Sequence, residues 1–305
     1  VQSFLSYANQ YMKPFNAISA VVTQVQTAYA SARRVFDLLD AKEIKPDPVD
    51  AEAIQNPQGT IEFDDVAFSY DSKHPLLNHI SFRAEPGQKI ALVGPTGCGK
   101  TTLINLLLRF YSIDSGAIYV DGHNTQKLTR ASLREQFGMV LQDTWLFKGT
   151  IKENIRYAKP DATDEEILEA ARLAQADSFV QTFPDKYETH IEQGGNNVSG
   201  GQKQRLCIAR ALLRRPKVLI LDDSTSAVDT KTDSLIRSGL KDFLPDTTKI
   251  IIAQRTSSIE ESDKIIVLDN GRVNAIGTHE ELLKDNPIYR EVYFSQNKQS
   301  VDENQ

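Results

Sequence analysis

The first forty residues carry a hydrophobic pattern with the spacing of one long helix. Apolar or small side chains recur every three or four positions from Phe4 to Leu39, as an amphipathic helix requires. No charged residue lies between Lys13 and Arg33, a stretch close to membrane-spanning length, although three amide side chains interrupt its apolarity. On periodicity alone two interpretations stay open. The helix packs in a soluble or coiled assembly, or it is the inner end of a spanning helix whose polar face meets other helices or water.

The pattern then changes to short segments with the composition of strands. Residues 41–59 contain three prolines and a glycine among mixed charges, which predicts a linker. From Thr60 onward, strands are expected around Ile61 to Phe68, at 80–83 and in the buried run 89–93. This part of the chain is therefore expected to begin with β-structure.

Helical and strand patterns alternate through the rest of the chain. Helices are expected at 102–111 and 162–175, the second opened by Thr163 and Glu166 in a capping box. Apolar runs of strand length follow at 218–221, 249–253 and 264–268. The alternation predicts an α/β fold with a mostly parallel sheet. Asn270-Gly271 is typical of a hairpin turn, and the polar tail from Gln296 is expected to fray.

Composition narrows the class of protein. The 305 residues are 40% apolar and 25% charged, which is typical of a folded globular chain. The net charge of −6 argues against binding to nucleic acid, which requires a basic face. Cys98 and Cys207 are the only cysteines, too few for a disulfide framework, so a reducing compartment is expected.

A glycine-rich segment between the strand at 90–93 and the next helix carries the first chemical prediction. Its residues are Gly94, Pro95, Thr96, Gly97, Cys98, Gly99, Lys100 and Thr101, with the spacing of a phosphate-binding loop. The glycines let backbone N–H groups surround an anion, while Lys100 adds a positive charge and the Thr101 hydroxyl can ligate Mg²⁺. The sequence therefore predicts binding of ATP with Mg²⁺. Cys98 is interpreted as a small residue that fits the loop, because no thiolate-stabilising surroundings are evident.

Two further segments bear on the same chemistry. The run from Lys217 has four apolar residues followed by Asp222 and Asp223, and Asp222 is expected to hold Mg²⁺ through its water shell. A strand-end turn with solvated acids is the plain alternative. The second segment opens an amphipathic helix with a further cluster of backbone amides, which by itself could be only a helix cap. Its residues are Ser199, Gly200, Gly201 and Gln202.

Together these segments resemble the nucleotide-binding domain of ATP-binding cassette (ABC) transporters over Thr60 to about Arg290. The resemblance implies a P-loop NTPase (RecA-like) core with a mostly parallel sheet, an N-terminal antiparallel β subdomain and an inserted helical subdomain at about 143–215. The domain is expected to span 60–295. The resemblance also assigns roles to single residues. Tyr70 would stack on adenine, Thr102 would extend the nucleotide contacts, Gln142 would sense Mg²⁺ and the membrane domain, and Asp229 would lie at the dimer seam.

The same resemblance implies a membrane setting for residues 1–40. They look like the end of the last spanning helix of a multidrug-type exporter, with the cassette on the cytoplasmic face of the cell membrane and a membrane domain on the same full-length chain. A half-transporter cut short at its N-terminus fits Val1. The expected cargo is a small molecule or a lipid.

Three positions depart from the family pattern. Asp223 stands where the family has the glutamate that polarises the attacking water, and Gln254 stands where it has a histidine. The segment Ile191 to Gly195 also differs from that of exporters, which puts its contacts to the membrane domain in doubt. The departures at Asp223 and Gln254 predict a slow nucleotide site and a heterodimer in which Ser199 to Gln202 completes the partner's competent site. The alternatives are a homodimeric exporter with Asp223 as base, and a soluble cassette ATPase.

Overall fold

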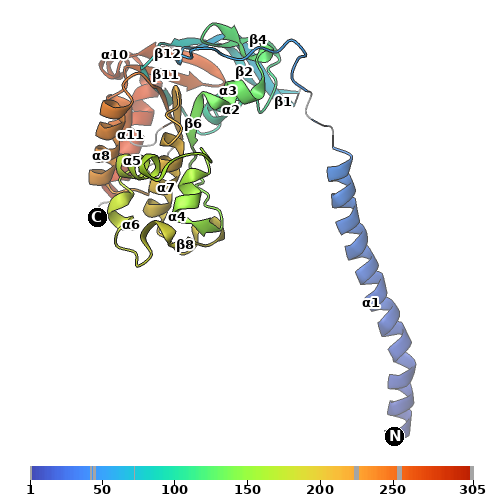
Figure 1. Cartoon of the computed structure of the whole chain (residues 1–305). Coiled ribbons are helices and arrows are strands. Elements are labelled where there is room, and N and C mark those ends of the chain that lie inside the picture. The colour runs from blue at the N-terminus through green and yellow to red at the C-terminus, as the bar shows by residue number, and fades with distance from the viewer. Residues whose placement is uncertain are drawn as a thin grey trace. The chain divides into compact units, whose positions relative to one another are not determined.

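The computed structural model describes residues 2–41, 43, 46–71, 73–222, 227–252 and 256–302, in two compact units (Figure 1). The first unit, residues 1–46, contains the helix α1(Gln2–Leu39), which matches the single helix that the apolar spacing predicts. Its large apolar side chains are exposed within this unit. In the described part of the chain, no helix combines the length and apolarity needed to cross a membrane.

The second unit begins with an antiparallel sheet of four strands in the order β2-β1-β4-β5. Its strands are β1(Ile61–Asp71), β2(His74–Ala84), β4(Ser115–Val120) and β5(His123–Asn124). Phe63 of β1 is paired with Phe82 of β2, and their rings stack with centroids 4.6 Å apart. Such a cross-strand aromatic pair stabilises the sheet through side-chain packing. The expected antiparallel β subdomain is present.

A six-stranded sheet, in the order β12-β11-β3-β10-β9-β6, forms the centre of this unit. Its strands are β3(Lys89–Val93), β6(Phe137–Val140), β9(Val218–Asp222), β10(Thr248–Ile252), β11(Lys264–Asp269) and β12(Arg272–Gly277). All neighbours run parallel except β12, which pairs antiparallel with β11 across the turn at Asn270 and Gly271. Both turn residues have positive φ, 46° and 71°, as a type I′ hairpin requires. The predicted α/β class and mostly parallel sheet are confirmed.

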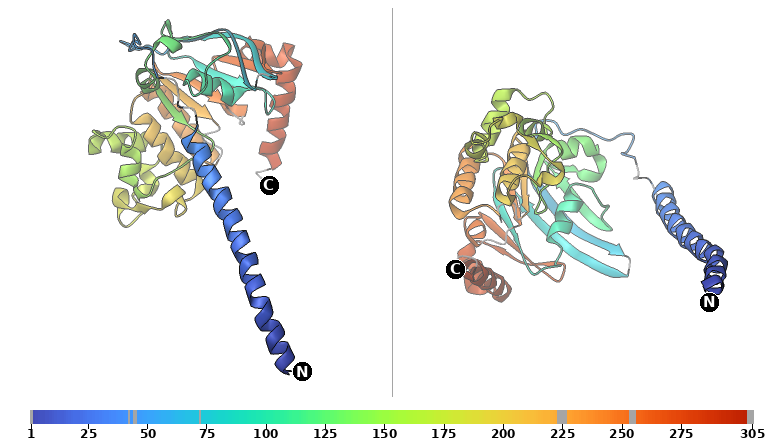
Figure 2. Two further views of the ribbon diagram at one scale, coloured as in Figure 1. Left: turned by 90° about the vertical axis from the view of Figure 1, so that its right-hand side faces the viewer. Right: turned by 90° about the horizontal axis from the view of Figure 1, so that it is seen from below.

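Helices surround the two sheets (Figure 2). They are α2(Lys100–Leu107), α3(Arg130–Glu135), α4(Ile151–Arg156), α5(Asp164–Leu173), α6(Asp177–Val180), α7(Gly200–Leu212), α8(Thr230–Phe243), α9(Thr256–Glu260), α10(His279–Asp285) and α11(Pro287–Asp302). The capping box expected at Thr163 and Glu166 opens α5. Figure 2 shows the group from α4 to α7, in green and yellow, and the red helices α10 and α11 at opposite ends of the second unit. A small ribbon of β7(Gly149–Thr150) and β8(His190–Ile191) belongs to the former group, with short 3₁₀ turns nearby.

The predicted linker is only partly a linker. From Asp47 onward it belongs to the second unit, because the Asp47 carboxylate accepts hydrogen bonds from the backbone N–H and guanidinium of Arg130 at 2.9 and 2.6 Å. Ile54 is 8% exposed within the core, and the Asp121 carboxylate accepts the backbone N–H groups of residues 58–60. Long-range contacts of this kind leave no local sequence pattern, so the composition rule predicted a free connection.

Two predicted helix boundaries also need correction. The helix expected at 102–111 begins at Lys100 and ends at Leu107, because Arg109 adopts a left-handed conformation with φ 54°. The Arg134 guanidinium donates to the carbonyl oxygens of Leu108 and Arg109, which satisfies backbone groups that the helix leaves unpaired. At the other terminus, the polar tail expected to fray from Gln296 continues the backbone of α11 as far as Asp302.

Candidate nucleotide-binding site

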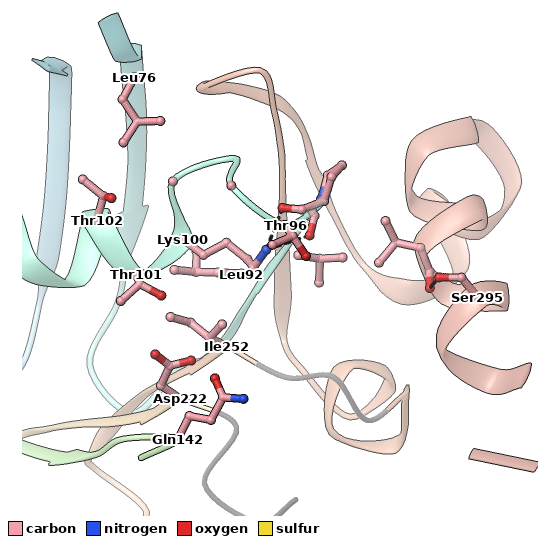
Figure 3. A pocket seen from close by; sticks show the side chains of 16 residues that line it. Leu76, Leu92, Thr96, Lys100, Thr101, Thr102, Gln142, Asp222, Ile252 and Ser295 are labelled. Carbon is pink, nitrogen blue, oxygen red and sulfur yellow. Dashed lines mark hydrogen bonds between the residues drawn. The ribbon is translucent and has the colours of Figure 1, made fainter. Parts of the chain in front are cut away.

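A cavity of about 640 Å³ opens where β3, β9 and β10 end (Figure 3). Ligands of open α/β sheets bind at the carboxyl ends of the strands, where loops and helix N-termini converge. The cavity brings together most of the predicted site residues. They are Gly94, Pro95, Thr96, Gly97, Gly99, Lys100, Thr101, Thr102, Gln142 and Asp222.

The glycines of the loop each meet a different local requirement. A Cβ on Gly94 would lie 2.2 Å from the carbonyl oxygen of Leu268, so there is no room for a side chain where β3 passes into the loop. Gly99 is the N-cap of α2 with φ 102°, a conformation that L-residues disfavour. A Cβ on Gly97 would meet no atom within 4 Å, because it would point into open space. Two glycines thus serve the fold of the loop, while Gly97 keeps the cavity clear.

Lys100 lies across the loop that it follows. Its ammonium donates hydrogen bonds to the carbonyl oxygens of Gly94 and Pro95 at 2.7 and 2.9 Å. The Cys98 sulfur is 3.7 Å from the same nitrogen, and Cys98 is only 6% exposed within the core. A positive charge is therefore held at the edge of the cavity beside the N-terminus of α2, whose dipole also favours an anion. Cys98 packs as a small core residue and does not line the cavity.

The side chains of Thr101 and Asp222 lie close together in the cavity (Figure 3). Burial raises the pKa of Asp222, while the Lys100 charge and a hydrogen bond from the Thr101 side chain lower it and offset part of that effect. A hydroxyl and a carboxylate are hard ligands of the type that Mg²⁺ prefers, and Mg²⁺ in nucleotide sites takes only one or two protein ligands. Among the described residues, no group of three or more His, Cys, Asp or Glu forms a separate metal cage. The donor set fits Mg²⁺ held jointly with phosphates.

Tyr70 lies beside the cavity and does not line it. Its hydroxyl is 3.2 Å from the Thr102 hydroxyl, and the residue is 54% exposed. The rings of Phe68 and Tyr111 meet it edge-on, with centroids 4.8 and 5.0 Å away. Edge-to-face contacts fix the plane of an aromatic ring. The Tyr70 ring is therefore oriented by its neighbours and remains accessible.

The second amide cluster lies outside this cavity. Ser199 is the N-cap of α7, and it forms a reciprocal capping box with Gln202. Gly201 packs so closely that a Cβ would lie 2.7 Å from the Ala227 carbonyl oxygen, and Gln204 accepts the Ala227 N–H at 3.0 Å. None of the four residues of the cluster lines the nucleotide cavity of its own chain.

Asp229 also caps a helix away from the cavity. Its carboxylate accepts the backbone N–H of Thr232 at 2.9 Å at the start of α8, and this contact lowers the pKa of Asp229. The two catalytic predictions, Asp223 and Gln254, lie outside the described residues. The structure does describe the residues at the ends of β9 and β10, Asp222 and Ile252, and both line the cavity.

Sequence reasoning missed part of the cavity wall. Val292 and Ser295 of α11 and Leu76 of β2 line it, although they are far from the loop along the chain (Figure 3). No local pattern marks these residues. Val292 and Ser295 reach the site through the packing of α11, in which Tyr289 is fully buried and the Tyr293 hydroxyl donates to Glu260 at 2.5 Å.

Comparison with known proteins identifies the class to which this fold and site belong. The family model described as ABC transporter matches residues 77–226. The chain belongs to the ABC transporter family and is a nucleotide-binding cassette of the exporter type. The resemblance inferred from the motifs is therefore confirmed. Domains of this class bind ATP.

Individual relatives agree with this assignment. The chain is 46% identical over 289 residues to a fatty acid ABC transporter ATP-binding/permease protein of Mycobacterium bovis, covering 95% of this chain and 46% of that protein. It is 45% identical over 293 residues to the uncharacterized ABC transporter ATP-binding protein YfiC of Bacillus subtilis, covering 96% and 48%. The solved structure of a bacterial Atm1-family ABC exporter with ATP bound matches with a TM-score of 0.82 and 36% identity, over 95% of this chain and 51% of that one. The chain spans about half the length of the curated relatives that it matches.

Proposed function

We propose that this chain is the cassette of one half of a heterodimeric export transporter, and that its own site binds ATP with Mg²⁺ but hydrolyses it slowly. The observation that carries the proposal is the pair Asp223 and Gln254, which replace the glutamate and histidine of the family pattern. Along the chain, Asp223 directly follows β9 and Gln254 is the second residue after β10, and the last residue of each strand lines the nucleotide cavity. We therefore propose that the two departures act on the activation of the attacking water.

The described residues of the cavity support the proposed binding of ATP with Mg²⁺. The loop from Gly94 to Thr101 offers backbone N–H groups and the Lys100 ammonium to the phosphates. Thr101 and Asp222 would hold Mg²⁺, which supplies charge neutralisation at the outer phosphates. Tyr70 would stack on adenine, since its ring is oriented and accessible. Gln142, which lines the cavity, would contact the metal shell when nucleotide is present.

The replacements at Asp223 and Gln254 would slow ATP hydrolysis at this site. Asp223 is one methylene shorter than glutamate, which retracts its carboxylate by about 1 Å, and a misplacement of that size costs roughly 100-fold in rate. Gln254 can donate a hydrogen bond to phosphate but cannot carry a positive charge or a transferable proton at neutral pH. Transition-state charge at this site would therefore be less well stabilised.

The amide cluster at Ser199 supports a head-to-tail pair of cassettes, in which the departures at Asp223 and Gln254 favour a heterodimer. It opens α7, lies outside its own chain's cavity, and keeps a complete capping box. In a head-to-tail pair of cassettes it would complete the partner's site, with Asp229 at the seam. The partner is then a second half-transporter, and the assembled transporter lies in the cell membrane with this cassette on the cytoplasmic side. We propose a small molecule or a lipid as cargo, since the matched relatives include a fatty acid transporter.

Restoration of the family residues tests the proposal. The variant Asp223→Glu with Gln254→His, assembled with the natural partner, should raise ATP turnover at this chain's own site by about 100-fold relative to its unaltered rate. A partner variant lacking its own phosphate-loop lysine isolates this chain's contribution. The control Lys100→Ala should weaken MgATP binding, because it removes a charge-assisted contact. Unchanged turnover in the restored variant would refute the degenerate site.

The homodimeric alternative makes the opposite prediction. If Asp223 is an effective base, the chain by itself should hydrolyse ATP at the rate of ordinary cassettes, and Asp223→Asn should abolish that activity. Measurement of the steady-state ATPase of the purified chain, with and without the partner, distinguishes the two assemblies.

A further inference from the structure

A hydrogen bond joins the aromatic part of the nucleotide site to its phosphate-binding part. The Tyr70 hydroxyl lies 3.2 Å from the hydroxyl of Thr102. Tyr70 is the residue before the last of β1 in the antiparallel sheet, whereas Thr102 is the third residue of α2, the helix that follows the phosphate loop. The two residues are 32 positions apart along the chain. This contact therefore fixes the position of the Tyr70 ring relative to the first turn of α2.

Thr102 is a buried residue at the edge of the nucleotide cavity. It is 7% exposed, and it belongs to the cavity lining. Buried hydroxyl groups normally have a hydrogen-bond partner, and within the described ranges the partner of the Thr102 hydroxyl is Tyr70. The neighbouring Thr101 instead bonds to Asp222, and Figure 3 shows Thr102 apart from both of them. The two adjacent threonines therefore serve different groups of the site: Thr101 the acidic side chain, and Thr102 the aromatic ring.

Three contacts that the structure describes restrict the Tyr70 side chain. The rings of Phe68 and Tyr111 meet its ring at interplanar angles of 83° and 89°, which fixes the plane of the ring. The contact with Thr102 holds the hydroxyl end of the same side chain, although the residue is 54% exposed. A side chain that is ordered before its ligand arrives loses less conformational freedom on binding, which favours affinity. The contact with Thr102 should therefore strengthen stacking on the ring.

We propose that Thr102 is a positioning residue for nucleobase binding, which acts through Tyr70 and not through contact with the phosphates. Its hydroxyl holds the Tyr70 ring in the position where the flat face of adenine stacks. This role rests on the proposed function, because it requires Tyr70 to stack on adenine. The Thr102 hydroxyl then affects only the binding of ligands that carry a base.

Two ligands that share a triphosphate group separate this role from a phosphate contact. MgATP carries the base, whereas magnesium tripolyphosphate does not, and the affinity of the 305-residue chain for each is measured by isothermal titration calorimetry. Thr102→Val keeps the branched shape of the side chain and removes the hydroxyl. It should weaken MgATP binding about fivefold, which corresponds to one neutral hydrogen bond, and leave tripolyphosphate binding unchanged. Lys100→Ala should weaken both, because its charge acts on the phosphates of either ligand.

Two further variants distinguish the hydroxyl contact from a general loss of packing. Thr102→Ser keeps a hydroxyl and should bind MgATP within about twofold of the unaltered chain. Thr247→Val makes the same change as Thr102→Val at a residue that is 4% exposed and lies outside the cavity lining, where it removes a hydrogen bond to the Pro216 carbonyl oxygen at 2.8 Å. This control should leave MgATP binding unchanged.

Tyr70→Phe tests the other end of the contact. It keeps the ring and removes its hydroxyl, so it should also weaken MgATP binding about fivefold. Because both hydroxyls belong to one hydrogen bond, the double variant with Thr102→Val should bind no more weakly than either single variant.

Four outcomes overturn the role of Thr102. They are losses that multiply to about 25-fold in the double variant, an equal loss of MgATP and tripolyphosphate binding in Thr102→Val, weak MgATP binding by Thr102→Ser, and weakened MgATP binding by Thr247→Val. Normal MgATP binding by Thr102→Val refutes this role alone, whereas an unaltered chain that binds no MgATP refutes the proposed function as well.

Discussion

Alanine at Gly94 and alanine at Gly97 should separate the folding role of the phosphate loop from its ligand role. At Gly94 the new methyl carbon would lie 2.2 Å from the Leu268 carbonyl oxygen and 2.8 Å from the Cys98 sulfur. Relief requires the backbone to move by about 1 Å at the edge of a packed core, and overpacking of this kind costs about 1–3 kcal/mol. At Gly97 the methyl carbon would meet no atom within 4 Å.

The cost at Gly97 comes from the backbone alone. Its φ of 83° is left-handed, which costs an alanine about 1–2 kcal/mol, and the stiffer unfolded chain returns up to about 1 kcal/mol. The net loss of stability should therefore centre on about 1 kcal/mol. Gly97 lines the nucleotide cavity, however, so its methyl group would occupy space that the phosphates need. Gly94→Ala should act mainly on stability, and Gly97→Ala mainly on binding.

Two measurements decide the matter. Thermal unfolding without nucleotide, followed by circular dichroism, should show Tm lower by about 5 °C for Gly94→Ala and by about 2 °C or less for Gly97→Ala, since 1 kcal/mol corresponds to about 2 °C in a domain of this size. Calorimetric titration with MgATP should show affinity at least about tenfold weaker for Gly97→Ala. The reasoning fails if Gly94→Ala unfolds within about 0.5 kcal/mol of the wild-type chain, or if Gly97→Ala binds MgATP normally.

Three further predictions concern single side chains. Because burial raises the pKa of Asp222, its ionised carboxylate destabilises the fold; this cost is absent at low pH and develops as pH rises from the ordinary carboxyl range through the raised value. Asp222→Asn should therefore be more stable than wild type in urea unfolding at pH 7 without nucleotide. A less stable variant would contradict this. Tyr111→Leu should weaken MgATP binding about fivefold, because Tyr70 loses an edge-to-face contact worth about 1 kcal/mol; calorimetry showing equal affinity would count against it. Ser199→Ala and Thr163→Ala each remove a helix cap and should each cost about 1 kcal/mol in urea unfolding, but only Ser199→Ala should lower ATP turnover of the assembled pair; equal turnover in the two variants would refute the role of Ser199 in the partner's site.

Features formed by residues close together along the chain could be predicted from the sequence. The loop from Gly94 to Thr101, the strand before it and the turn at Asn270 each depend on neighbours a few residues away, so residue spacing is enough to define them. The capping boxes at Thr163 and Ser199 follow the same logic, although the sequence left open whether Ser199 was only a cap. The family assignment rests on these local motifs and is confirmed by the comparisons.

Long-range placement was decided only in the tertiary structure. The sheet order brings Asp222 of β9 beside Thr101, more than a hundred residues earlier, and α11 adds Val292 and Ser295 to the same cavity. The segment from Asp47, predicted as a linker, is held by Arg130 across the fold. The sequence determined the phosphate loop and the class of protein because both depend on residues close together along the chain, while the walls of the nucleotide cavity depend on packing between distant segments.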